Sequence, residues 1–216
     1  MKEKKDKSLE KTVFITTLLC LLPMLVGLAL YNRFPEQMVT HWDATGTPNG
    51  YSSKFVAIFV LPGSLALLNM LMPFFMKMDP KYQNMGEKLK MLVVWIIPMV
   101  ALFASGSTMA YGLGIDVPIP ALGTALVGFV LVLIGNYLPK TKQSYTLGIK
   151  LPWTLYDEEN WNKTHRLGGF LWVCGGLLIL VSSLFTWRIY VLPICMILMV
   201  VIPTVYSYML YRKKSA

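Results

Sequence analysis

The sequence predicts an all-α, polytopic membrane protein with six transmembrane helices and both termini in the cytoplasm. Hydrophobic residues make up 55% of the 216 residues and charged residues only 14%, whereas soluble domains carry about 25% charged residues. The charges are clustered, so long charge-free runs remain between them. The net charge of +9 does not indicate nucleic-acid binding, because the basic residues lie at the ends of apolar runs rather than on one face.

Each charge-free run is long enough to cross a bilayer as a helix, which rises about 1.5 Å per residue. The third and fourth runs are separated by Asp116 and the helix breakers Pro118 and Pro120, and the fifth and sixth by Arg188. No small-residue cleavage site follows the basic start, so the first run is interpreted as an uncleaved span. The six predicted spans are 12–32, 55–76, 91–115, 117–139, 167–187 and 189–211.

The same runs divide the chain into five regions. The ends are basic cytoplasmic tails, and the regions between them combine spans with two polar loops. The regions are 1–11, 12–54 with the first span and outer loop, 55–139 with spans two to four, 140–211 with the second loop and last two spans, and 212–216.

Charge asymmetry predicts the orientation. Alternate loops and tails on one side hold 17 of the 20 Lys and Arg residues, and the opposite set holds three. Basic residues favour the cytoplasmic side, where the leaflet is anionic. The loop 140–166 is therefore predicted to be cytoplasmic and the loop 32–54 to face outward.

The predicted spans contain no Asp, Glu, Lys, Arg or His. Ionisable groups within a membrane usually mark ion or proton pathways, so this absence argues against a coupled transporter. The three cysteines lie in apolar runs without CxxC spacing. They are expected to be small core residues rather than a disulfide framework.

The outer loop combines turn-forming residues with a short polar and aromatic motif, His41-Trp42-Asp43. A tryptophan at this depth fits the interfacial aromatic belt. One interpretation is therefore an anchored loop in which His41 and Asp43 hydrogen-bond the backbone. The other is a recognition surface for a molecule arriving from outside.

The inner loop is predicted to contain a short interfacial helix at about 155–166. Thr154 and Asp157 have the spacing of a capping box, and the acidic residues that follow suit a helix N-terminus. Trp153 would lie at the start of this helix and Trp161 would face lipid. Gly168 and the glycine after it would end or bend the helix before the fifth span.

Within this predicted helix, Glu158, Asn162 and His165 fall on nearly the same face, and Arg166 lies in the last turn. The helix is either a capped connector or a surface that docks a partner or ligand. The two histidines are not expected to share a metal ion, because His41 and His165 are predicted on opposite sides of a hydrocarbon core about 30 Å thick. No HExxH, GxSxG or Walker motif is present, so no enzymatic site or cofactor is expected.

Both loops resemble a known family. The segment 35–54 around His41-Trp42-Asp43 resembles a domain of unknown function often found at the N-terminus of SdpI-type membrane proteins. The second loop is similar to the signature of the SdpI family, although Lys150 stands where Arg is usual and Ser144 where Asn is common. The residues that carry this second resemblance are Gly135-Asn136, Gly148-Ile149-Lys150, Pro152-Trp153-Thr154-Leu155, Trp161 and Thr164-His165-Arg166.

The resemblance implies a bacterial immunity protein that protects the cell from a secreted, membrane-disrupting peptide toxin related to SdpC. It also implies that toxin engagement lets such a protein hold a small DNA-binding autorepressor at the membrane. On this basis the candidate toxin contacts are His41, Trp42 and Asp43. The candidate cytoplasmic docking or structural residues are Asn136, Trp153, Thr154, Glu158, Trp161, His165 and Arg166.

Two other functions remain open from the sequence. One is a transporter or exporter of a peptide or lipid-like compound, since an uncoupled route needs no buried charge. The other is a membrane-embedded hydrolase with a metal held by a loop.

Overall fold

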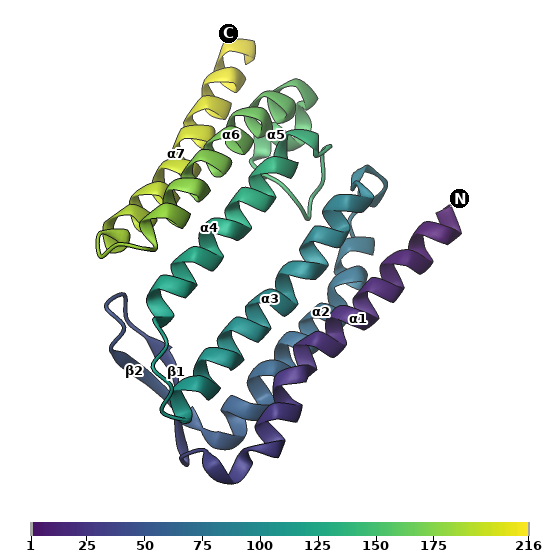
Figure 1. Ribbon diagram of the computed structural model, residues 1–216. Coiled ribbons are helices and arrows are strands. Elements are labelled where there is room, and N and C mark those ends of the chain that lie inside the picture. Colours follow the sequence, from purple (N-terminus) through teal and green to yellow (C-terminus); the bar gives the residue numbers. More distant parts are fainter. Residues whose placement is uncertain (1, 216) are drawn as a thin grey trace. The chain divides into compact units, whose positions relative to one another are not determined.

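The computed structural model describes residues 2–215 and is mostly helical (Figure 1). Short 3-10 segments precede β1 and α3 and follow α4, and a π-helical stretch at Val56–Val60 leads into α2. In chain order the helices and strands are α1 (Lys2–Ala29), β1 (Gln37–Trp42), β2 (Pro48–Ser53), α2 (Leu61–Lys77), α3 (Glu87–Gly112), α4 (Ile119–Tyr137), α5 (Pro152–Tyr156), α6 (Glu158–Ser182) and α7 (Arg188–Ser215).

The six predicted spans are confirmed, and the chain is a multi-pass membrane protein. Among the described residues, six helical segments are long and apolar enough to cross a membrane: Lys7–Ala29, Val56–Lys77, Glu87–Gly112, Ile119–Lys140, Glu158–Ser182 and Arg188–Lys214. The largest shift in bounds is in the fifth, which begins at Glu158 rather than at 167. Its polar first turns continue the helix beyond the apolar run.

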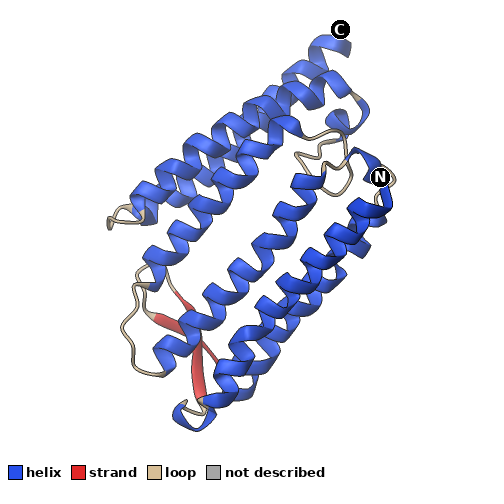
Figure 2. Cartoon of the chain, turned by 45° about the vertical axis from the view of Figure 1, so that its right-hand side comes forward, coloured by secondary structure: helices blue, strands red, loops and turns tan. Residues whose placement is uncertain are grey.

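A β-hairpin occupies the outer loop, where the sequence predicted only successive turns (Figure 2). β1 and β2 pair antiparallel, with Gln37 opposite Ser53 and Val39 opposite Tyr51. Two register irregularities, on either side of His41, interrupt the pairing. Gly46 has φ +98° in the connecting turn, a conformation that glycine adopts without a side-chain clash.

The short helix is real, but its predicted position was wrong. It spans Pro152–Tyr156 as α5, and Asp157 then interrupts the helical path with φ −128° and ψ 109°. Proline suits a first helical turn because its missing N–H would have no partner there. The residues predicted to form the rest of the short helix instead begin α6, which continues through Gly168.

The described chain divides into two compact units, each with its own core. The N-terminal unit comprises residues 2–73 and 90–123. Its buried side chains include Cys20, Ile58 and Ile97. The Asn69 side-chain amide lies 2.8 Å from the Thr16 hydroxyl, which joins α2 to α1 by a buried polar contact of the kind that stabilises helix pairs in membranes.

The C-terminal unit comprises residues 74–89 and 124–215, and glycines bring α4 and α6 into backbone contact. A Cβ added at Gly128 would lie 2.8 Å from the Gly176 carbonyl oxygen, and one added at Gly135 would lie 3.0 Å from that of Gly169. Close approach of this kind replaces the hydrophobic driving force that is absent between helices in lipid.

The cysteines only partly match expectation. Cys20 and Cys195 are buried, as predicted, but Cys174 on α6 is exposed. None of the three forms a disulfide among the described residues.

The α4–α6 contact predicts opposite effects for two Gly→Ala substitutions. Gly128→Ala should destabilise the protein by about 1–3 kcal/mol because the new methyl group overlaps backbone. Gly106→Ala in α3 meets nothing within 4 Å, so it should stabilise by about 0.5–1 kcal/mol through the better helix propensity of alanine. Thermal unfolding of the two purified variants in one detergent checks the signs, and equal shifts would contradict the packing.

Candidate functional site

Trp161 lies at the centre of a cluster that contains several residues of the SdpI-like signature. The sequence placed it against lipid, but its side chain is 0% exposed. Its indole Nε1–H donates to the Thr141 carbonyl at 2.9 Å. It stacks on His165 with ring centroids 3.9 Å apart. Trp161 is therefore a core residue that joins α6 to the loop preceding α5.

His165 is also fully buried, and its hydrogen bonds fix its tautomer. The Ile149 N–H donates to Nε2 at 2.8 Å, so this nitrogen carries no proton. Nδ1 then carries the proton and donates to the Trp161 carbonyl, also at 2.8 Å. The neutral ring therefore uses both nitrogens structurally, and neither is left to ligate a metal or act as a base.

Gly148 lets the loop pass over this pair of rings. Its φ is +119°, and a Cβ at this position would lie 2.6 Å from His165 Nε2 and 2.7 Å from a Trp161 ring carbon. Backbone at this φ is unfavourable for other residues. We name Thr141, Gly148, Ile149, Trp161 and His165 the tryptophan–histidine cluster.

Thr154 ties α5 to the same loop and is also buried. Its hydroxyl oxygen accepts from the Leu151 N–H at 2.9 Å and lies 2.9 Å from the Ile149 carbonyl, to which it donates. Thr154 thus lies inside α5 and is not the N-cap that the sequence predicted. The cap of α6 is Asp157, whose carboxylate accepts from the backbone of Glu159 and Asn160.

Asp79 accepts hydrogen bonds from the part of the same loop that contains Ser144 and Thr146. The sequence alone did not identify it. Its side chain is 5% exposed and accepts from the Ser144 hydroxyl at 2.7 Å, the Thr146 N–H at 2.8 Å and the Lys81 N–H at 2.7 Å. Burial acts to raise the pKa of Asp79, but these hydrogen bonds outweigh it and lower the pKa below the ordinary value.

Asp79→Asn should destabilise the C-terminal unit by about 1–3 kcal/mol, because the amide presents a donor where the carboxylate accepted. Since the folded pKa is depressed, the contribution of Asp79 is complete above the unfolded value of about 4 and is lost as pH falls through the folded pKa. Thermal unfolding of wild type and variant between pH 7 and 3 measures this. The difference between them should shrink in acid, and a gap that stays constant would contradict the assignment.

A second polar network joins α5, α6 and α7. The Trp153 indole N–H donates to the Ser207 hydroxyl at 2.7 Å. That hydroxyl donates to the Asn160 side-chain oxygen at 2.7 Å, which also accepts from Thr164 at 2.9 Å. Trp153 further packs on Tyr211, with centroids 5.7 Å apart. Trp153 is thus a structural anchor between helices.

Three of the candidate inner residues lie outside both networks. Asn136 on α4, and Glu158 and Arg166 on α6, are exposed. Asn162 is exposed as well, while His165 is buried. Because α6 is a continuous helix from Glu158 onward, Glu158, Asn162 and His165 do fall on nearly the same face, as predicted. Packing buries only His165 and leaves the other two exposed.

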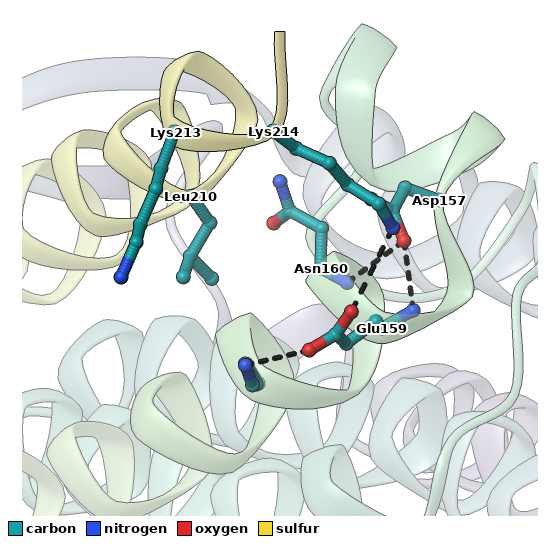
Figure 3. Close-up of a pocket in the computed structure, with 7 residues that line it drawn as sticks. Asp157, Glu159, Asn160, Leu210, Lys213 and Lys214 are labelled. Atoms are coloured by element: carbon teal, nitrogen blue, oxygen red, sulfur yellow. Dashed lines mark hydrogen bonds and ion pairs between the residues drawn. The ribbon is translucent and has the colours of Figure 1, made fainter. Parts of the chain in front are cut away.

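Charged residues of α6 and α7 form a surface network beside a pocket of about 300 Å³ (Figure 3). Lys214 lies 2.9 Å from Asp157 and 3.6 Å from Glu159, and Lys163 lies 2.7 Å from Glu159. The Lys214 hydrogen bond lowers the pKa of Asp157. Lys213 also lines the pocket but makes none of these contacts. Exposed pairs of this kind stabilise little, so the network mainly shapes a charged surface.

The outer motif divides into a structural and an exposed part. The Asp43 carboxylate accepts from the backbone of Thr45 and Thr47, both at 2.9 Å, and from the Thr45 hydroxyl at 2.7 Å. The Thr45 hydroxyl and these amides lower the pKa of Asp43. Asp43 therefore closes the hairpin turn, in agreement with the anchored-loop interpretation.

His41 and Trp42 remain as surface candidates. His41 is exposed and its Nδ1 hydrogen-bonds the Asn49 side chain across the hairpin. Trp42 packs edge-on against Tyr111 of α3, with centroids 5.8 Å apart. Within residues 2–215, no group of three or more His, Cys, Asp or Glu side chains could hold a metal ion.

The sequence did not identify some residues of these networks, because their hydrogen-bond partners lie far away along the chain. Asp79 and Ser144 meet across 65 positions, and Asn160 and Ser207 across 47. The departure at Ser144 from the common Asn was the one available signal, since that hydroxyl supplies a direct bond to Asp79. Lys150, the other departure, is exposed and donates to the Thr146 carbonyl at 3.2 Å.

Comparisons with known proteins confirm both resemblances. Residues 140–207 match the SdpI/YfhL protein family, and residues 18–65 match a domain of unknown function, DUF1648. The chain is 28% identical over 207 residues to the protein named immunity protein SdpI of Bacillus subtilis (strain 168), covering 95% of this chain and 98% of that relative. No solved structure gives a significant match.

Proposed function

We propose, from the match of residues 140–207 to the SdpI/YfhL family, that this chain is an immunity protein of the bacterial cell membrane. It protects the cell against a secreted peptide toxin related to SdpC. The observation that carries the proposal is similarity to an immunity protein over 95% of the chain. Gly148, Trp161 and His165 of the signature also pack into one cluster, in which hydrogen bonds occupy both histidine nitrogens.

The positive-charge asymmetry supports an orientation in which the β-hairpin faces outward and the tryptophan–histidine cluster faces the cytoplasm. A toxin then meets the hairpin, where His41 and Trp42 are available, while Asp43 keeps the turn in shape. The lipid bilayer surrounds the six helical spans.

We further propose that the cytoplasmic end binds a small DNA-binding autorepressor when the toxin is engaged. Since Trp161, His165 and Thr154 are buried, the docking surface consists of exposed neighbours. Tyr156 is 84% exposed, and Glu158 and Arg166 are exposed on the first turns of α6. Engagement outside would then change the affinity inside, which is a coupling between two sites.

Survival of a toxin-sensitive strain that lacks its own immunity gene tests the first proposal. Cells expressing this chain should survive SdpC that kills cells carrying the empty vector. His41→Ala should reduce survival, whereas the matched control Asn162→Ala, an exposed polar residue of α6, should not. Equal killing with and without the chain, at confirmed membrane levels, would refute protection against SdpC.

Recruitment of the fluorescent autorepressor to the membrane tests the second proposal. Toxin should move the repressor from the nucleoid to the membrane in cells expressing the chain. The double variant Glu158→Ala, Arg166→Ala should lose recruitment and keep survival. Survival without recruitment by the unaltered chain would leave immunity standing and eliminate the signalling role.

A further inference from the structure

A pocket of about 440 Å³ opens at the hairpin end of the N-terminal unit. The end of β1, the hairpin turn, the end of α3 and the start of α4 form it. Gly46 at φ +98° fits the turn against Pro120, where an added Cβ would lie 3.2 Å from the proline ring. The lining residues are Trp42, Gly46, Tyr111, Gly114, Ile115, Asp116, Val117, Ile119 and Pro120.

One of the residues that line the pocket carries an unsatisfied hydrogen-bond donor. Trp42 lines the pocket, and the Trp42 indole Nε1–H is buried without a hydrogen-bond partner in the described part of the chain. Buried tryptophan N–H groups usually find a partner. Because the N–H is shielded from solvent, a bound molecule that supplies an acceptor oxygen would satisfy this donor if the indole turns toward the pocket.

The residues that line the pocket supply a negative charge and no positive charge. Asp116 is exposed and makes no ion pair within residues 2–215, and no basic side chain lines the pocket. Tyr111, Ile115 and Val117 add apolar surface around this carboxylate. The complementary ligand therefore carries a carbonyl acceptor, a positive charge and apolar groups together.

We propose that this pocket binds an extended, basic peptide segment. A main-chain carbonyl of the peptide accepts from the Trp42 indole, and a Lys or Arg side chain pairs with Asp116. The adjoining sheet has only two strands among the described residues, so its outer edges can add a peptide strand. This feature favours a peptide over the amine headgroup of a lipid. The inference rests on the proposed function in taking the toxin as the natural peptide.

Indole signals from tryptophan-labelled full-length protein in nanodiscs of phosphatidylcholine and phosphatidylglycerol give a direct test. Trp42→Phe identifies the Trp42 signal, and the signals of the five other tryptophans show whether that variant is folded. The probe is a synthetic heptapeptide of alternating Leu and Lys. It should move the Trp42 indole proton downfield, as formation of a hydrogen bond requires, and leave the Trp187 signal in place.

Matched variants test the charge. Asp116→Asn should weaken binding of the probe about fivefold, which corresponds to one charge-assisted contact at a partly solvated site. Glu10→Gln, an exposed acid on α1, should leave the affinity unchanged. A heptapeptide of alternating Leu and Glu should not move the Trp42 signal.

The outcomes separate this inference from the proposed function. A Trp42 signal that the Leu–Lys peptide does not move, or that both peptides move equally, overturns the peptide site. A signal that moves on adding phosphatidylethanolamine to the nanodisc, and then resists the peptide, assigns the pocket to a lipid headgroup and overturns it too. Binding of the probe without protection from SdpC supports the site and contradicts the proposed toxin.

Discussion

Trp161→Ala is expected to abolish protection by unfolding the C-terminal unit, with a loss of about 3–5 kcal/mol. The substitution empties a fully buried position and removes the stack on His165. It also leaves the Thr141 carbonyl without its indole donor. A single domain commonly has about 5–15 kcal/mol of total stability, so the unit would lose a large share of it.

The measurement is thermal unfolding of purified protein in detergent, together with the amount of protein in the membrane. Trp187→Ala is the matched control, since Trp187 is 42% exposed and should cost less than about 1 kcal/mol. If Trp161→Ala unfolds at the wild-type temperature, the Trp161 side chain does not stabilise the core of the C-terminal unit. Loss of function in this variant reports on folding and cannot identify a docking contact.

Gly148→Ala is expected to destabilise the same unit by about 2–5 kcal/mol, the combined cost of an unfavourable φ and of overpacking. A new Cβ would have to displace either the His165 imidazole or the Trp161 ring, both of which are fixed by hydrogen bonds. The loop would move away, and the Ile149–His165 bond would break with it.

Gly86→Ala provides the control, because a Cβ at Gly86 meets nothing within 4 Å. The control should unfold within a few degrees of wild type, whereas Gly148→Ala should unfold well below it. Exchange of the Ile149 amide with solvent gives a local readout and should accelerate only in Gly148→Ala. A slow Ile149 amide in that variant would show that the loop tolerates the methyl group.

Much of the fold is encoded locally and could be predicted from the sequence. A helical span depends on the composition of about 20 consecutive residues, so all six were found. Of the two predicted breakers, Pro118 lies between α3 and α4, whereas Pro120 lies in the first turn of α4. The family signature likewise identified Gly148, Trp161 and His165 as belonging together. The helix ends were predicted less accurately. Asp157 caps α6 because its backbone is extended there, and the sequence alone does not show that conformation.

The sequence by itself determined the membrane class, the spans and the residues of the signature, since these depend on composition and on motifs along the chain. Only the tertiary structure decided what those residues do. Trp161 has the amphipathic character of an interfacial anchor, yet a loop fixed by Asp79, which lies 65 positions from its partner Ser144, covers it. Pairing across such distances is set by packing, and no local pattern encodes it.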